Sequence, residues 1–74
     1  MKVFVLIETA MGKSKEVTTA LKQLAEVKSA NIVTGPYDVI AIIEGANLND
    51  IGGLVTAKIH LIAGISRTVM CITK

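Results

Sequence analysis

The sequence predicts an α+β fold in which six elements follow one another as β-α-β-β-α-β and four strands form one antiparallel sheet. Four segments are rich in β-branched and other apolar residues, which favours strands. Two segments between them repeat apolar residues at intervals of three and four, which favours helices. The chain has 74 residues, of which 51% are hydrophobic. We therefore expect a single small domain over residues 1–74.

The first half of the chain is expected to form a strand, a helix and a second strand. β-Branched and aromatic residues predict the first strand over residues 2–8. The helix is expected over residues 12–26, with Ser14 as its N-cap. Its apolar stripe consists of Val17, Ala20, Leu21 and Leu24. A more polar second strand is expected over residues 27–34.

The second half is expected to form two further strands with a helix between them. The Gly-Pro-Tyr segment 35–37 indicates a turn, because proline has no backbone N–H to pair in a ladder. A third strand is expected over residues 38–44, and a second helix after the N-cap residue Asn47. The apolar stripe of this helix consists of Leu48, Ile51, Val55, Ile59 and Ile62. Gly64 ends the segment, and residues 65–73 are expected to form the fourth strand.

This element order is that of ferredoxin-like folds, in which right-handed crossovers place both helices on one face of the sheet. An uncovered second face ordinarily carries polar residues, so that each strand alternates. The strands at 2–8 and 38–44 are instead apolar on both faces. We therefore expect a second copy of the chain to cover the open face, which gives a dimeric αβ-barrel.

Composition and charge exclude several classes of function. The net charge of +2 gives little electrostatic support for binding nucleic acid, so we expect no direct contact with DNA. No apolar run is long enough to span a membrane. The chain has one cysteine, Cys71, which fits a reducing cytoplasm and is expected to be buried as a small apolar residue.

Residues that could serve catalysis or metal binding are scarce. One cysteine and one histidine cannot complete a four-ligand zinc site. His60 is expected near the end of the second helix, where a cation complements the negative helix end, and a role as a general base is the alternative. Gly52 and Gly53 are expected to allow close packing of that helix, either on the sheet or on a neighbour. We expect no catalytic residues, no metal and no cofactor, and hence no enzyme.

The segment from Thr34 to Asp38 holds the densest group of polar functions. A turn here leaves backbone groups outside the regular ladder and adds the Tyr37 phenol and the Asp38 carboxylate. Such groups can bind the ammonium and carboxylate groups of an amino acid. The alternative is that Asp38 bonds to nearby backbone amides and only stabilises the turn.

Three stretches of the chain resemble the C-terminal effector domain of the Lrp/AsnC transcription regulators, which is also called the RAM domain. They are residues 35–39, 54–59 and 64–68, and the resemblance extends from Val3 to Ile72. It implies dimers formed through the sheet face, assembly of the dimers into rings, and an amino acid bound between dimers. The effector-binding residues that it implies are Gly35, Pro36, Tyr37, Asp38 and Thr68.

The chain departs from this family at two points. Full-length members carry a DNA-binding domain before this module, whereas the first strand here follows Met1 directly, so we expect a stand-alone form. Thr68 matches the first threonine of a Thr-x-Thr pair, but Met70 occupies the second position. Because a thioether offers no O–H group, this change favours an effector with a larger apolar side chain, or no effector.

The leading hypothesis is a module that binds an amino acid or a related small metabolite, forms oligomers and acts on transcription through full-length Lrp/AsnC regulators. A purely structural oligomerisation module without a ligand is the first alternative. A small αβ-barrel enzyme is the second, although such sites ordinarily need more aromatic residues than this chain has.

Overall fold

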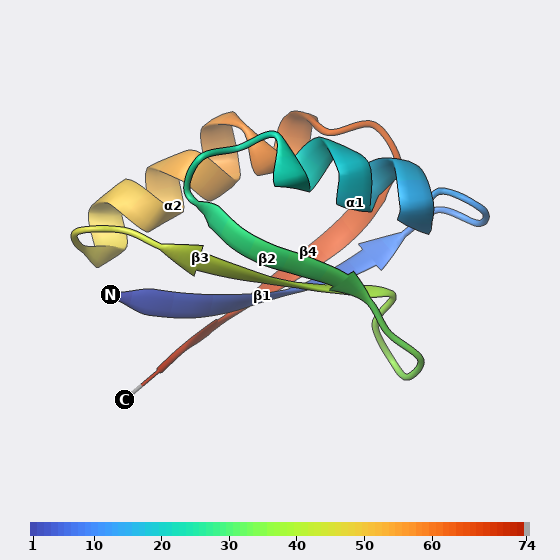
Figure 1. Cartoon of the computed structure of the whole chain (residues 1–74), viewed down its shortest axis with the longest axis horizontal. Coiled ribbons are helices and arrows are strands. Elements are labelled where there is room, and N and C mark those ends of the chain that lie inside the picture. The colour runs from blue at the N-terminus through green and yellow to red at the C-terminus, as the bar shows by residue number, and fades with distance from the viewer. Residues whose placement is uncertain (74) are drawn as a thin grey trace.

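The computed structural model describes residues 1–73, and its elements follow the expected β-α-β-β-α-β order of a ferredoxin-like α+β fold (Figure 1). The strands are β1 (Lys2–Thr9), β2 (Val27–Ile32), β3 (Val39–Glu44) and β4 (Ile65–Ile72). The helices are α1 (Ser14–Lys22) and α2 (Leu48–Ala57), and a short 3-10 helix, η1 (Ile59–Leu61), follows α2. The fold class predicted from the sequence is confirmed.

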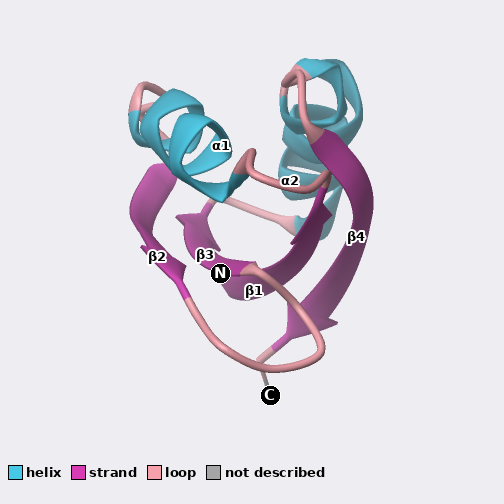
Figure 2. Cartoon of the chain, turned by 90° about the vertical axis from the view of Figure 1, so that its right-hand side faces the viewer, coloured by secondary structure: helices cyan, strands magenta, loops and turns pink. Residues whose placement is uncertain are grey.

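The four strands form one antiparallel sheet in the order β2-β3-β1-β4, so β1 and β3 are central while β2 and β4 are edges. Figure 2 shows both helices on the same face of the curved sheet. The opposite face carries no helix, as expected from the crossovers. Within the described residues, no helix is long and apolar enough to cross a membrane.

The hydrophobic core lies between the sheet and the two helices. Alternate residues of the central strands point into it, and Val5 is fully buried opposite Ala41 of β3. The sheet contributes Val3, Val5, Ile7, Val27, Ala30, Val39, Ala41 and Ile43 to the core. The helices contribute Val17, Leu21, Ile51, Leu54, Val55 and Ile59. Burial of each large aliphatic side chain contributes about 1.5–3 kcal/mol, and this packing is what holds the helices on the sheet.

The open face of the sheet is also apolar. Its side chains belong to the residues that alternate with the core positions, and they are only half-buried because no described element lies over them. They are Phe4, Leu6, Ile40, Ile42 and Val69. We call this group the open-face cluster. The expectation that both faces of the central strands are apolar is therefore confirmed.

Helix α1 is shorter than the predicted range 12–26. Its N-cap is Lys13, without a side-chain capping bond, so the prediction of Ser14 as the cap is wrong. The Ser14 hydroxyl lies instead 2.9 Å from the Thr9 hydroxyl at the end of β1. Ser14 is the first residue of the helix rather than the residue before it, and its hydroxyl ties the helix start to β1. Strand boundaries differ from the predicted ones by one or two residues.

Helix α2 begins as predicted, but its apolar stripe does not continue in one helix. The Asn47 side chain accepts a hydrogen bond from the backbone N–H of Asp50 at 2.9 Å, which confirms this N-cap. The α-helix ends at Ala57, and η1 brings Ile59 into the core. Leu48 was wrongly assigned to the buried stripe, because 42% of its surface is exposed.

Two further expectations fail within the described chain. Cβ atoms added at Gly52 and Gly53 would meet no atom outside their own helix within 4 Å, so neither glycine serves close packing of α2 on the sheet, while packing against another molecule stays a prediction. Cys71 is exposed rather than buried, because β4 is an edge strand and Cys71 lies opposite Phe4 on the open side of the sheet.

We expect Gly64→Ala to lower the free energy of unfolding by about 2 kcal/mol. Gly64 has φ +97°, and an added Cβ would lie 2.9 Å from Cβ of Lys13. Gly53→Ala is the control, because it fills open space in α2 and should raise the free energy of unfolding by up to about 1 kcal/mol. Urea denaturation of both variants measures the difference, and equal stabilities would contradict the prediction.

Candidate functional site

The turn between β2 and β3 projects from the end of the sheet opposite the chain termini (Figure 1). Gly35 and Pro36 are exposed in it and Tyr37 is half-buried. Gly35 has φ +154°, a backbone conformation that other residues rarely adopt. The backbone N–H of Val33 donates to the carbonyl of Asp38 at 2.9 Å and closes the turn.

Asp38 holds this turn against the end of β1. Its Oδ2 atom accepts hydrogen bonds from the backbone N–H of Thr9 at 2.9 Å and from the Thr9 hydroxyl at 3.3 Å. The backbone N–H of Asp38 donates to the carbonyl of Ile7 at 2.9 Å. The Thr9 hydroxyl also forms a hydrogen bond with the Ser14 hydroxyl. A continuous series of hydrogen bonds therefore links the turn to the first residue of α1. Asp38 thus bonds to a backbone amide, but to that of Thr9, 29 positions away, rather than to the nearby amides of its own turn. Its side chain remains half-exposed.

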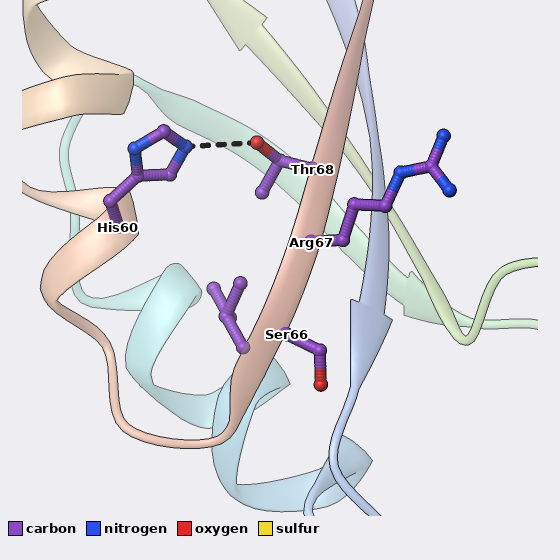
Figure 3. Close-up of a pocket in the computed structure, with 5 residues that line it drawn as sticks. His60, Ser66, Arg67 and Thr68 are labelled. Carbon is purple, nitrogen blue, oxygen red and sulfur yellow. Dashed lines mark hydrogen bonds between the residues drawn. The ribbon is translucent and has the colours of Figure 1, made fainter.

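Thr68 lies on β4, and its hydroxyl forms a hydrogen bond with Nε2 of His60 at 2.9 Å (Figure 3). His60 is located on η1 and is exposed, whereas Thr68 is half-buried. The sequence places His60 near the end of a helix but gives no sign of this bond. Residues eight positions apart on a 3-10 helix and a strand have no fixed spacing, so only the packing of η1 beside β4 brings them together.

The pair borders a cavity of about 340 Å³ at the edge of the sheet. Its lining residues are His60, Ile65, Ser66, Arg67 and Thr68. In Figure 3 the Thr68 hydroxyl points toward His60, while the Arg67 side chain extends to the other side of β4. Hydrogen-bond donors are thus available at this cavity, and its volume is within the usual range for a small-molecule site.

Among the described residues, the predicted effector residues do not all line the His60–Thr68 cavity. Residues 35–38 are absent from the lining of the His60–Thr68 cavity. Thr68 and Val39 pair with Ile7 from opposite sides, so Asp38 and Thr68 lie at the same end of the sheet with β1 between them. Two strand spacings amount to roughly 10 Å. The structure therefore separates the predicted site into a turn part and a β4 part.

Met70 lies two residues after Thr68 and is 37% exposed. Its Cα pairs with Val5, a residue of the helix-covered face, so Met70 and Thr68 lie on the same face of the sheet.

Among residues 1–73, no group of three His, Cys, Asp or Glu side chains could hold a metal ion.

Comparison with known proteins relates nearly the whole chain to one family. Residues 2–73 match the family described as the Lrp/AsnC ligand binding domain. A search of curated proteins gives no significant match.

Several solved structures are similar. The crystal structure of FFRP-DM1 is 37% identical, with a TM-score of 0.92 over 99% of this chain and 97% of that one. A hypothetical protein from Pyrococcus horikoshii is 36% identical, with a TM-score of 0.85 over 99% and 90% of the two chains. A transcriptional regulator from Neisseria meningitidis, solved as an L-Met complex, is 16% identical with a TM-score of 0.86, which shows a shared fold alone. The match covers 99% of this chain but 49% of the regulator.

Proposed function

The chain belongs to the Lrp/AsnC ligand-binding domain family, and from this premise we propose that it binds an amino acid or a related small metabolite and forms oligomers. The family is one of regulatory effector domains and is not an enzyme family. The observation that carries the proposal is the family match over residues 2–73. We propose that full-length regulators of the same family are the partners through which it acts on transcription.

The exposed parts of the predicted site support an amino acid as the ligand. The turn at 35–38 offers backbone groups and a half-exposed carboxylate, and the cavity at Thr68 offers hydroxyl and imidazole groups. The L-Met complex of the Neisseria regulator is an amino-acid complex of the same fold. Met70, in place of a threonine, favours an effector with an apolar side chain of that kind.

The open-face cluster supports dimerisation. A stable protein–protein contact ordinarily buries about 800 Å² of surface on each partner. The total accessible surface of the chain is 4560 Å², so such a contact would cover less than a fifth of it. Sheet-to-sheet packing of two copies would bury the half-buried apolar residues of β1, β3 and β4 in one step. Further assembly of dimers would then allow the turn of one subunit to approach the β4 cavity of another. The turn part and the β4 part of the predicted site would in this way form one site.

A structural oligomerisation module without a ligand is the second candidate. The observation that favours it is the pair of hydrogen bonds from Thr9 to Asp38, which gives the carboxylate a role that needs no ligand.

A thermal-shift screen of the twenty amino acids separates the two candidates. A ligand at one hundred times its dissociation constant should add about 2.7 kcal/mol to the free energy of unfolding. If no amino acid raises the melting temperature of a well-folded oligomer, the structural candidate takes the lead.

We expect Asp38→Asn to weaken binding of the amino acid found in this screen by about a hundredfold or more. The variant removes the negative charge that would pair with an α-ammonium group. Its amide oxygen can still accept the hydrogen bond from the Thr9 N–H, so the turn should keep its position. Isothermal calorimetry measures the affinity, and sedimentation confirms the assembly state. If Asp38→Asn binds the amino acid as tightly as the parent, the prediction is contradicted, and Asp38 serves only to hold the turn through its bonds to Thr9.

A further inference from the structure

The two oxygen atoms of the Asp38 carboxylate have different surroundings. Oδ2 accepts both hydrogen bonds from Thr9, at 2.9 Å from the backbone N–H and 3.3 Å from the hydroxyl. Within residues 1–73, Oδ1 accepts no hydrogen bond, and neither of the two ion pairs includes Asp38. A carboxylate can accept about four hydrogen bonds. Oδ1 is therefore the atom that is free to accept from a ligand.

The direction of the hydrogen bonds at the Thr9 hydroxyl is fixed. This hydroxyl donates to Oδ2 of Asp38. Because a hydroxyl has one proton to donate, Thr9 must be the acceptor in its other bond, in which the two hydroxyl oxygens of Thr9 and Ser14 are 2.9 Å apart. Ser14 thus donates to Thr9, and Thr9 donates to Asp38.

Both ends of this series are held by the fold. At the helix end, the carbonyl of Ser14 accepts from the hydroxyl of Thr18 at 2.8 Å, and Thr18 is buried. At the strand end, the pairing of β1 with β4 shifts its register between Glu8 and Thr9, so Thr9 pairs with Ile65. Irregularities of this kind bend a strand and often lie beside functional sites. The N–H of Thr9 donates here to a side chain, that of Asp38.

We propose that Thr9 and Ser14 are positioning residues, which hold Oδ2 of Asp38 and leave Oδ1 to accept from the ammonium group of a ligand. The inference rests on the proposed function in that the ligand is an amino acid. The terminal torsion of an aspartate side chain is broad, so an unrestrained carboxylate rotates. Fixing the carboxylate before the ligand arrives reduces the entropy that is lost on binding.

Methylammonium is a suitable probe, since it carries an ammonium group with N–H donors and a single methyl group. An NMR titration of the whole chain would follow the backbone amides of Thr9 and Asp38. Tetramethylammonium has the same charge but no N–H group, and it is the control for charge alone. We expect saturable shifts of both amides with methylammonium and no saturable shift with tetramethylammonium.

Substitutions of Thr9 separate the role of its hydroxyl from that of its backbone N–H. Thr9→Val removes the hydroxyl, keeps a β-branched side chain and leaves the N–H bond to Asp38 in place. We expect this variant to raise the dissociation constant of methylammonium by about five- to tenfold. Thr9→Ser restores a hydroxyl at the same position, so its dissociation constant should lie within about twofold of that of the parent.

Two further variants complete the test. Ser14→Ala removes the donor to the Thr9 hydroxyl and should raise the dissociation constant by about threefold. Thr19→Val is the matched control for the loss of a threonine hydroxyl, because Thr19 is exposed on α1 and its hydroxyl bonds to the carbonyl of Lys15. This control should bind methylammonium as the parent does. Circular dichroism checks that each variant folds.

Several outcomes would overturn the positioning role. One is a dissociation constant for Thr9→Val equal to that of the parent, and another is a loss of affinity that Thr9→Ser does not restore. If Thr9→Val does not fold, Ser14→Ala decides, and an unchanged dissociation constant then overturns the role. These results would leave the proposed function intact.

The probe and the amino-acid screen also give distinguishable results. If methylammonium gives no saturable shift, or if tetramethylammonium gives the same shifts, the inference is overturned, while an amino acid that binds in the screen still supports the proposed function. If methylammonium binds as expected but no amino acid binds, the positioning of Asp38 is supported and the proposed amino-acid ligand is removed.

Discussion

Val5→Asp is expected to abolish cooperative folding of the domain. Val5 is fully buried in central strand β1, opposite Ala41 of β3 and Met70 of β4, beneath the helices. A carboxylate there would be buried without a partner, which costs several kcal/mol in addition to the lost apolar contacts. Small domains have a free energy of unfolding of about 5–15 kcal/mol, so this loss is enough to unfold the chain.

Thermal melting followed by circular dichroism measures the effect. Val5→Ala is the control for the loss of side-chain volume, and it should melt cooperatively at a lower temperature. A Val5→Asp variant that melts within a few degrees of the parent would show that the helix-covered face is not the core.

Leu6→Asp is expected to leave the chain folded and to separate the proposed dimer into monomers. Leu6 is adjacent to Val5 but belongs to the open-face cluster, where it lies between Ile40 of β3 and Val69 of β4. In a monomer the carboxylate would be hydrated. In a symmetric dimer both copies would bury the charge, so the cost would be incurred twice. We expect the dimer dissociation constant to rise by at least about a thousandfold, which corresponds to about 4 kcal/mol.

Sedimentation equilibrium at micromolar concentration measures the assembly of this variant. Thr19→Asp introduces the same charge on the exposed side of α1, and it should assemble as the parent does. A parent chain that is itself a folded monomer at this concentration would contradict the proposed dimer. A Leu6→Asp dimer as tight as that of the parent would place the interface elsewhere.

The order and type of the elements follow from the sequence, because they depend on interactions between near neighbours. β-Branched residues mark β1 and β3, and apolar residues at helical intervals mark α1 and α2. Asn47 could be identified as an N-cap because the capping bond spans three residues. The presence of two apolar faces on the central strands was also evident, since side chains alternate along any strand.

Predictions failed where the position of a residue depends on how an element begins or where a strand lies in the sheet. Ser14 has the side chain of an N-cap, but the helix begins one residue earlier than that role requires, and its hydroxyl contacts Thr9 across the loop. Cys71 has an apolar sequence context, yet it lies on an edge strand and is exposed. The position of Cys71 in the sheet does not follow from the residues adjacent to it in sequence.

The sequence by itself determined that the chain forms two helices and four strands and that β1 is apolar on both sides. Which side meets the helices was decided by the tertiary structure, because alternation is the same whichever face is covered, and only packing distinguishes Val5 from Leu6. The site was decided in the same way. The bond from Thr9 to Asp38 joins residues 29 positions apart, and the bond from His60 to Thr68 joins a 3-10 helix to a strand. Side-chain hydrogen bonds act only at distances near 3 Å, so they form where the packing of whole elements brings their groups together.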